Sequence, residues 1–346
     1  MTSVDVTIRG AGIFGLSIAW ALTQRGARVQ VVDPHGAGAG SSGGIVGALA
    51  PHVPENWNEK KAFQLDSLLM AETFWREVEQ AGGQSAGYGR TGRLQPVMDD
   101  NGLGLARERA TGAAQLWRGQ AVWEVVKDAG PLAPASPTGW LIRDTLTARM
   151  HPRHACAALV AALAARGVPV LAQAEDAGAV LWATGWRGLL DLTEATGRKV
   201  GDGVKGQAVA MRFDAGADAP QLFVDGLHIV PHADGTVAIG STSERTFDDP
   251  TATDAQCEGL IERARDALPA LRKAEVIERW AGVRPRARSR APLLGRWPDR
   301  AGHYVANGGF KIGFGMAPKI ADVMADLILN DQWGGIPEGF RIGGPE

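Results

Sequence analysis

The chain is poor in cysteine and has no long apolar run. Only Cys156 and Cys257 occur among its 346 residues, far apart and with no CxxC pair. This leaves no basis for a disulfide framework or a thiolate metal cluster, and it is typical of a reducing compartment. No apolar stretch approaches the ~20 residues of a membrane helix, and the N-terminus lacks the pattern of a secretory signal. We therefore expect a cytoplasmic protein that has no membrane contact.

The chain also lacks a strong excess of either charge. It carries 36 basic and 38 acidic residues, with a net charge of −2 and a sequence pI of about 6.4. This balance argues against a nucleic-acid partner, which a basic chain would attract. Apolar residues make up 45% and charged residues 21%, as in ordinary globular proteins. The length predicts two closely packed domains or one large α/β unit, and it leaves an oligomer open.

The opening segment predicts a βαβ unit. Val4 to Arg9 form an apolar strand, a glycine turn follows, and Leu16, Ala19 and Trp20 recur at helical spacing. A second apolar strand runs from Val29 to Asp33. The start of the chain is therefore Rossmann-like.

Helical and sheet-rich segments alternate along the rest of the chain. We expect helices over about 60–80 and 103–117, a helix ending at Gly167, a helix opened by the capping-box pattern of Thr253 to Gln256, and a last helix that carries Met316. Short strands fill 90–150, and an antiparallel meander fills 203–245. The alternation predicts an α/β fold with α+β insertions and two discontinuous domains. One is built from residues 1–85, 151–203 and 284–346, and the other from 86–150 and 204–283.

The segment "GAGIFG" between the first strand and helix matches GxGxxG. Gly10 permits a tight turn, Gly12 lets a pyrophosphate approach the backbone, and Gly15 lets the helix pack on the sheet. The helix N-terminus offers free N–H groups to phosphates. Asp33 ends the second strand, where a carboxylate can bind a ribose diol. These features predict a bound dinucleotide.

Three further segments favour FAD over NAD. "GSSGGIVGALAP" directly follows the second strand, where a flavin enzyme wraps the rest of its cofactor. "LWATGW" is a strand that ends in glycine. "ANGGFKIGFG" is a glycine bend before a helix N-terminus, which would stabilise negative charge on a reduced isoalloxazine ring.

Together these segments make nearly the whole chain resemble the FAD-dependent D-amino acid oxidase superfamily, particularly its glycine oxidase and sarcosine oxidase branches. "GLHIVPHADGTVAIGSTSE" resembles the family's hairpin "YLVPRxDGxxxxGxTxE", and "WAGVRPRARSRAPLLG" resembles "WAGLRPxxxDxxPxIG". The resemblance implies a two-domain FAD-binding fold of the glutathione reductase type, with a mixed-sheet substrate domain. It also implies oxidation of the C–N bond of a small amino acid or N-substituted glycine. Hydride would pass to the flavin, the imine would hydrolyse, and O2 would reoxidise the flavin to give hydrogen peroxide.

The family motifs carry over to particular residues. Arg284 stands where sarcosine oxidase has the cysteine that tethers its flavin, so the resemblance implies noncovalent FAD. The expected cofactor-binding residues are Gly10, Gly12, Ile13, Phe14, Gly15, Asp33, Pro34, Ser41, Ser42, Gly43, Gly47, Ala48, Leu49, Ala183, Thr184, Gly185, Trp186, Arg284, Gly308, Gly309, Phe310, Lys311 and Ile312.

Two cations are the main candidates for substrate binding. Lys311 in "GGFKIG" aligns with the sarcosine oxidase lysine that helps to hold the substrate carboxylate, and Arg284 aligns with the carboxylate-clamping arginine of glycine oxidase. The alternative is a lysine that snorkels to water and an arginine in a structural ion pair. His52 is a third candidate, and His228 or His232 would be a further lining residue or an ordinary histidine.

Arg286, Arg288 and Arg290 follow Arg284 at alternate positions. They form either a solvated strand face or a basic strip at the pocket mouth.

The chemistry requires no catalytic acid or base if the substrate amine is neutral when hydride leaves. The protein would position the donor carbon and bind the carboxylate. No Ser/His/Asp, Cys/His or metal-ligand arrangement is evident, so we expect no metal.

Three alternatives stay open. "SSGGIVGALAP" also resembles the flavin loop of the oxidoreductase that modifies the carboxymethylaminomethyl group of tRNA wobble uridine. A dehydrogenase with an acceptor other than O2 is the second alternative, and a protein that binds FAD without catalysis is the third.

Overall fold

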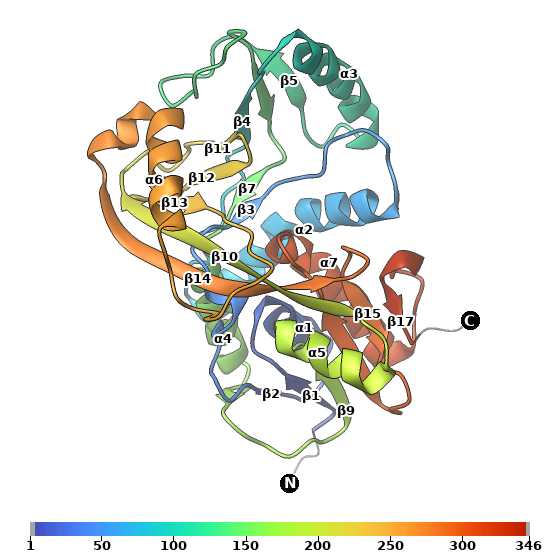
Figure 1. Cartoon of the computed structure of the whole chain (residues 1–346). Coiled ribbons are helices and arrows are strands. Elements are labelled where there is room, and N and C mark those ends of the chain that lie inside the picture. Colours follow the sequence, from blue (N-terminus) through green and yellow to red (C-terminus); the bar gives the residue numbers. More distant parts are fainter. Residues whose placement is uncertain (1–3, 344–346) are drawn as a thin grey trace.

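The computed structural model describes residues 4–343 and has two halves, each centred on a sheet (Figure 1). The lower half in Figure 1 contains a seven-stranded sheet with the order β17-β15-β16-β9-β1-β2-β8. Neighbouring strands are parallel except for β15 and β16, which are antiparallel. The strands are β1 (Val6–Arg9), β2 (Val29–Val32), β8 (Val170–Leu171), β9 (Ala179–Trp182), β15 (Leu293–Arg296), β16 (His303–Asn307) and β17 (Arg341–Ile342).

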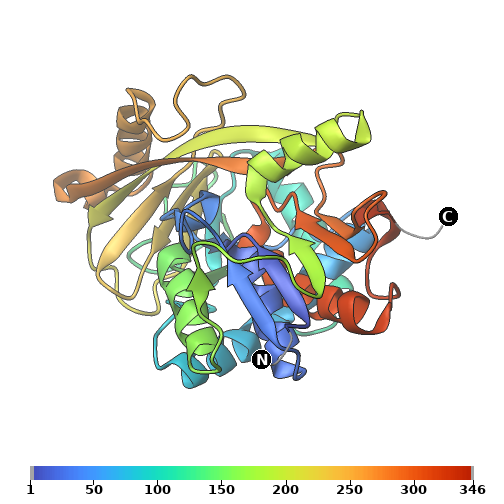
Figure 2. The same cartoon turned by 90° about the horizontal axis from the view of Figure 1, so that it is seen from below.

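The upper half contains an eight-stranded sheet with the order β14-β10-β13-β12-β11-β4-β6-β5. Its pairs are antiparallel except for β4 and β11. The two longest strands, β10 and β14, cross above the seven-stranded sheet in Figure 2. The strands are β4 (Arg93–Pro96), β5 (Trp123–Val126), β6 (Leu141–Asp144), β10 (Gly201–Arg212), β11 (Gln221–Val224), β12 (Leu227–Pro231), β13 (Thr236–Gly240) and β14 (Glu275–Ala287).

Helices cover both sheets, and four of them form the main core. α1, α2, α4 and α7 pack on one another and bury Trp20 and Trp75 in the largest hydrophobic cluster. The helices are α1 (Ile13–Gln24), α2 (Glu59–Gly82), α3 (Asp100–Leu116), α4 (Pro152–Ala164), α5 (Gly185–Thr196), α6 (Gln256–Ala267) and α7 (Gly313–Asn330). A small sheet of β3 (Ala48–Leu49) and β7 (Ala148–Arg149) joins the loop "GSSGGIVGALAP" (residues 40–51, the flavin-loop candidate) to the segment before α4.

The architecture confirms the predicted mixed α/β fold. Strands from the beginning, middle and end of the chain meet in the seven-stranded sheet. The domain boundaries stay a proposal. Those after residues 203 and 283 lie inside β10 and β14, which pair from Gly201 to Arg212 with one register shift.

The predicted capping box of α6 is wrong. The helix begins at Gln256 after Ala255, which makes no side-chain cap. The Asp254 carboxylate instead accepts from the Gln256 N–H at 2.9 Å and from Gln207 Nε2 at 2.9 Å. This carboxylate therefore ties the start of the helix to β10.

Within the described residues, no helix combines the length and the apolar character needed to cross a membrane.

Candidate functional site

The glycine turn between β1 and α1 is shaped by close backbone approach. Gly10 has φ +106°, and a Cβ there would lie 2.4 Å from the Ala183 carbonyl oxygen. A Cβ on Gly15 would lie 1.9 Å from the Gly10 carbonyl oxygen, so the helix packs directly on the turn. Gly12 is the N-cap of α1 and has no side chain to cap the helix. The turn therefore leaves backbone N–H groups at a helix N-terminus, as a pyrophosphate requires.

Asp33 lies directly beyond β2 and beside this turn. Its Oδ2 accepts from the Ala11 N–H at 2.8 Å, and its Oδ1 accepts from the His35 N–H at 2.9 Å. Each carboxylate oxygen has a second lone pair for a hydroxyl. Pro34 follows and is exposed. The predicted ribose-binding acid is thus held rigidly at the end of the second strand.

The loop after β2 folds back onto the start of α1. Ser42 Oγ accepts from the Ile13 N–H at 3.0 Å, and the Gly43 carbonyl accepts from Arg153 Nε at 2.8 Å. A Cβ on Gly47 would lie 1.9 Å from the Met150 carbonyl oxygen, so only glycine fits that position. Among the other predicted loop residues, Ser41 belongs to the same short 3-10 turn as Ser42 and Gly43, and Ala48 and Leu49 form β3.

The segment after β9 lies against the other side of the turn. Ala183 N–H donates to the Arg9 carbonyl at 2.8 Å, and Gly185 begins α5. Thr184 is the N-cap residue of α5, and the Trp186 ring packs within 3.1 Å of a Cβ built on Gly203. The predicted segment therefore lies where the glycine turn and β10 meet.

The start of α7 adjoins the start of α1. A Cβ on Gly309 would lie 2.7 Å from Phe14 Cζ, and one on Gly313 would lie 3.8 Å from Ile13 Cγ2. α7 begins after Ile312, which makes no side-chain cap. Two helix N-termini therefore lie side by side, and their partial positive charges favour an anionic ligand. This glycine-lined arrangement fits the phosphates and the reduced ring of a flavin dinucleotide.

Arg284 lies in β14, directly against β10. A Cβ on Gly206 would lie 2.0 Å from Arg284 Nη1 and 2.2 Å from Cζ, so the guanidinium occupies space that only a glycine leaves free. Nη1 donates to the Thr242 carbonyl at 3.2 Å. Burial lowers the pKa of Arg284 to about 10, partly offset by the Glu244 carboxylate. Within residues 4–343 the guanidinium forms no ion pair. The structural ion pair considered as an alternative is therefore not formed there.

Lys311 lies in the turn between β16 and α7. Its side chain retains exposed area, yet surrounding protein lowers its pKa, and the Arg284 charge lowers it further. Its Nζ lies 5.8 Å from the centre of the Phe310 ring, and Phe310 takes the positive φ of +43°. The Phe310 N–H donates to the Pro285 carbonyl at 2.9 Å, so this turn packs on β14 beside Arg284 and the two predicted substrate-binding cations lie in one region.

His228 is brought to the same region from β12. Burial lowers its pKa to about 4, followed by the charges of Arg93 and Lys311. Its Nδ1 is buried without a partner among the described residues. His228 is therefore a neutral imidazole with an unused nitrogen, close enough to Lys311 to feel its charge.

The other two candidate histidines, His52 and His232, hydrogen-bond to groups other than Arg284 and Lys311. His52 hydrogen-bonds through its backbone and its ring to Gln64 Oε1 in α2, and burial lowers its pKa. His232 is 3% exposed, and its Nε2 hydrogen-bonds to the Ile45 carbonyl at 3.1 Å. No described contact joins His52 to Arg284 or Lys311. His232 instead stabilises the flavin-loop candidate through its hydrogen bond to Ile45.

The arginine strip is only partly a strand face. Arg286 lies in β14 with its Cζ 5.8 Å from the Phe310 ring centre. β14 ends at Ala287, so Arg288 and Arg290 lie beyond the strand and are exposed. The Arg290 carbonyl accepts from Lys60 Nζ at 2.5 Å.

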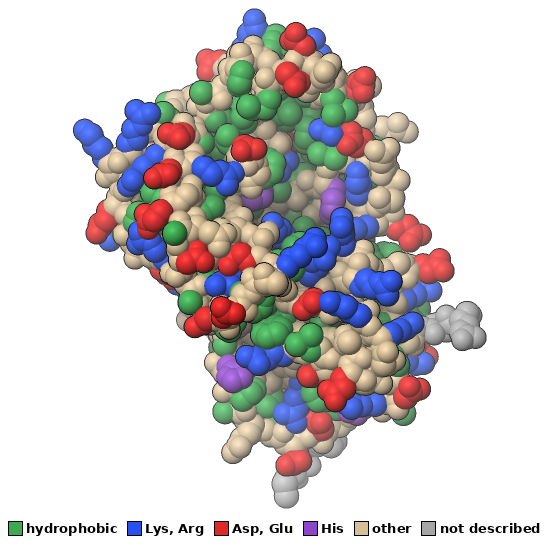
Figure 3. Space-filling view, viewed as in Figure 1, with side chains coloured by type: hydrophobic (Ala, Val, Ile, Leu, Met, Phe, Trp, Pro, Cys, Tyr) green, Lys and Arg blue, Asp and Glu red, His purple; other side chains and the backbone are tan. Residues whose placement is uncertain are grey.

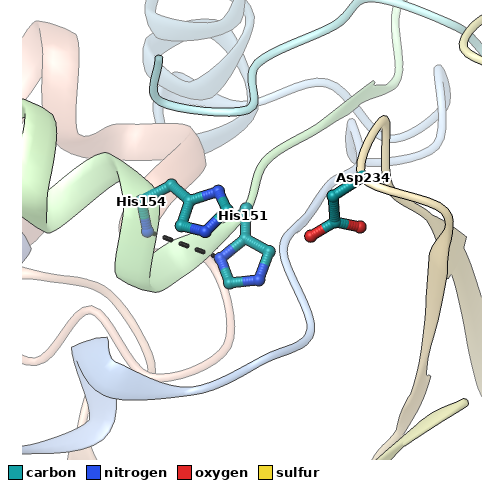
Figure 4. A group of neighbouring side chains, drawn as sticks. All are labelled: His151, His154 and Asp234. Carbon is teal, nitrogen blue, oxygen red and sulfur yellow. Dashed lines mark hydrogen bonds between the residues drawn. The ribbon is translucent and has the colours of Figure 1, made fainter. Parts of the chain in front are cut away.

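One cluster of possible metal ligands lies between the start of α4 and the turn that joins β12 to β13 (Figure 4). Ligand atoms of His151, His154 and Asp234 lie within 4.8 Å of one another. The two imidazole rings stack at 3.8 Å with an angle of 15°, so their in-plane lone pairs lie in nearly parallel planes. Burial, with the neighbouring His232, lowers the pKa of His151 to about 4. A shared ion would require one ring to turn out of this stack.

Gly206 and Thr242 were not predicted from the sequence. Both lie next to the Arg284 guanidinium, although neither is close to it along the chain. A lone glycine inside the apolar strand "VKGQAVAM" is a known indication of close approach by another group. That pattern, applied to β10, would have found Gly206.

Comparisons with known proteins agree with this geometry. The family model "FAD dependent oxidoreductase" matches residues 5–327. The chain belongs to this family. It is therefore an oxidoreductase that uses FAD.

The similar proteins are distant in sequence but alike in fold. The chain is 24% identical to a glycine oxidase of Geobacillus kaustophilus, over 94% of this chain and 92% of that protein. It is 29% identical to the bifunctional protein ThiO/ThiG of Synechocystis, of which it spans about half the length. The crystal structure of the Geobacillus kaustophilus enzyme superposes with a TM-score of 0.82 and 23% identity, covering 94% of this chain and 95% of that one. Iminodiacetate oxidase from Chelativorans sp. BNC1 superposes with a TM-score of 0.82 and 21% identity, covering 99% and 100%.

Proposed function

We propose that this enzyme oxidises the C–N bond of a small amino acid or an N-substituted glycine whose carboxylate binds Arg284 and Lys311. The observation that carries the proposal is a pair of cations next to the start of α7 that form no ion pair within residues 4–343. Relatives named glycine oxidase and iminodiacetate oxidase support this substrate class. His52 stays a predicted third contact.

The residues that would hold FAD lie in the segments described above. The glycine turn and Asp33 suit the adenosine diphosphate portion, and the loop from Ser41 to Leu49 suits the remainder. The start of α7 would stabilise negative charge on the reduced ring. We propose noncovalent binding. FAD supplies an acceptor for the hydride and its two electrons.

The chain's own contribution is to bind and orient the substrate. A guanidinium with unused N–H donors binds a carboxylate in bidentate fashion, and the ammonium adds a second charge-assisted bond. This holds the carbon between nitrogen and carboxylate in place while its C–H bond breaks. Positive charge from Arg284 and Lys311 also favours the neutral substrate amine, whose lone pair stabilises the developing imine. Water then hydrolyses the imine, which releases the amine and an oxo acid.

The test is anaerobic reduction of the yellow protein by a panel of amino acids, N-substituted glycines and amines without a carboxylate. We expect bleaching only by compounds that carry a carboxylate, with rapid return of colour and peroxide in air. We propose O2 as the electron acceptor. Slow return of the flavin colour in air would contradict this and indicate a different acceptor. Equal bleaching by an amine that lacks a carboxylate would disprove the role of the two cations.

A further inference from the structure

The turn that carries Lys311 is held against β14 beside Arg284, because the Phe310 N–H donates to the Pro285 carbonyl at 2.9 Å. Burial lowers the pKa of Arg284, whereas Lys311 is exposed and has its pKa lowered by partial desolvation and by the Arg284 charge. Within residues 4–343, Lys311 Nζ makes neither a hydrogen bond nor an ion pair. Arg284 uses one donor, on the Thr242 carbonyl. Two positive charges are therefore kept together with most of their donors free.

The Glu244 carboxylate, whose charge acts on Arg284, already has other partners. Glu244 lies 3.7 Å from Lys205 Nζ, accepts from Thr242 Oγ1 at 2.5 Å, and accepts from Gln207 Nε2 at 3.2 Å. Lys205 is 5% exposed, so it cannot exchange this partner for water. Glu244 therefore cannot neutralise Arg284 without leaving a buried lysine unpaired.

The positive region extends beyond these two residues. Arg286 and Lys311 both lie 5.8 Å from the centre of the Phe310 ring. Burial lowers the pKa of Lys60, and the Arg290 charge lowers it further. Figure 3 shows Lys and Arg side chains gathered where the upper and lower halves of the molecule meet. A protein of net charge −2 thus concentrates positive charge beside its candidate substrate site.

We propose that the substrate carries a second anionic group. Arg284 binds the carboxylate next to the reacting carbon, and Lys311 binds the second anionic group instead of sharing that carboxylate with Arg284. This inference rests on the proposed function. The chemical class is a secondary amine with two carboxylates, an N-carboxyalkyl glycine. A monocarboxylate brings one negative charge to two cations, whereas a dicarboxylate brings two and gives each cation its own partner.

The reaction on such a substrate balances with FAD as the two-electron acceptor. When FAD is bound, the C–H bond next to nitrogen would break and the hydride would leave the carbon with its electron pair. The nitrogen lone pair forms the C=N bond as the N–H proton goes to solvent. Water then cleaves the imine to glyoxylate and a primary amine that keeps the second carboxylate.

The experiment uses the FAD-loaded protein and two substrates of nearly equal shape. One is iminodiacetate, and the other is N-(carbamoylmethyl)glycine, in which an amide replaces one carboxylate. We expect kcat/KM to be at least tenfold higher for iminodiacetate. Lys311→Met should remove most of this preference, Lys311→Arg should retain it, and the exposed control Lys273→Met should leave it intact. Thiodiacetate, a thioether that cannot react in this way, should perturb the flavin absorbance at lower concentration than (methylthio)acetate.

The outcomes separate the two proposals. Equal kcat/KM for both substrates, with Lys311→Met lowering both equally, would overturn the second anionic group while leaving the oxidase intact. Failure of every small amine to reduce the flavin, together with reduction by tRNA that carries carboxymethylaminomethyl uridine, would overturn both proposals. A preference for iminodiacetate that Lys311→Met leaves unchanged would remove Lys311 from the role.

Discussion

Two arginines of the eight-stranded sheet have opposite environments. Arg93 in β4 is 5% exposed, and its Nε lies 2.9 Å from a carboxylate oxygen of Asp144, whose side chain is fully buried. Arg284 in β14 lies against a glycine and donates one hydrogen bond, to a backbone carbonyl. The sheet thus has a neutralised arginine near one edge and an unneutralised one at the other.

The difference separates a structural cation from one held for a ligand. Removing one member of a buried ion pair leaves the other charge without compensation, so Arg93 and Asp144 stabilise the fold together. Among residues 4–343 no carboxylate forms an ion pair with Arg284, so its removal leaves none of them without a partner. Arg93 should therefore affect stability, and Arg284 should affect substrate binding.

The largest expected effect is on Arg93. Arg93→Met should lower the free energy of unfolding by about 3–5 kcal/mol, because it leaves Asp144 charged and buried. Denaturant unfolding measures this change. The double variant Arg93→Met/Asp144→Leu is the matched control and should recover much of the loss. An unchanged unfolding midpoint in the single variant would remove the distinction between the two arginines.

The next effect is on substrate turnover at Arg284. Arg284→Met should lower kcat/KM for carboxylate-bearing substrates roughly 10- to 150-fold, the equivalent of a charge-assisted bond worth about 1.5–3 kcal/mol. Its unfolding midpoint should stay the same or rise, since an apolar side chain replaces a buried unpaired charge. Steady-state kinetics and denaturant unfolding, measured on one preparation, compare the effect on turnover with the effect on stability. A large loss of stability with normal turnover would mean that Arg284 is structural.

Gly206 gives a finer test of the same site. In Gly206→Ala, the new Cβ would lie within 2.2 Å of the guanidinium, which must move because it is the flexible end of its side chain. We expect a roughly tenfold fall in kcat/KM with little change in unfolding. Gly259→Ala is the control, since a Cβ there meets no atom within 4 Å. Normal kinetics in Gly206→Ala would show that the position of the guanidinium is unimportant.

The smallest effect is a shift with pH. The pKa of Lys311 lies below its ordinary value of 10.5, so the ammonium loses its proton at lower pH than an exposed lysine does. Its contribution to binding is present at neutral pH and decreases as pH rises through that pKa. KM for a dicarboxylate should therefore rise a few-fold before pH 10.5, by roughly tenfold per pH unit at most. Lys311→Arg should move the rise to higher pH, and an identical profile would exclude Lys311.

The cofactor turn could be predicted from the sequence because its glycine spacing is a local pattern. The contact of Gly15 with the Gly10 carbonyl lies within the βαβ unit itself, whereas Gly10 approaches Ala183 and Gly12 approaches Ser42, which the spacing does not show. The fold class followed from the order of helical and sheet-rich segments. The family resemblance placed Arg284 and Lys311, but it could not show that they lie close together without a counter-ion.

The features of the site that were not predicted depend on strand register, which a single sequence does not reveal. Gly206 faces Arg284 only because β10 and β14 pair Gly206 with Gly282 and Val204 with Arg284. Glu244 is held by Lys205 through an isolated bridge outside the named strands. The end of β14 at Ala287 likewise divided an arginine strip that alternates without interruption in the sequence.

The order of strands in the seven-stranded sheet has a consequence for biosynthesis. β9 lies between β1, from the beginning of the chain, and β16, which is synthesised almost three hundred residues later. The start of α7, which completes the candidate flavin site, follows β16. A ribosome therefore exposes the glycine turn long before its neighbouring helix N-terminus exists. We expect FAD to load only after nearly the whole chain has emerged, so the unfinished site depends on the growing chain, and not on its cofactor, to remain folded until then.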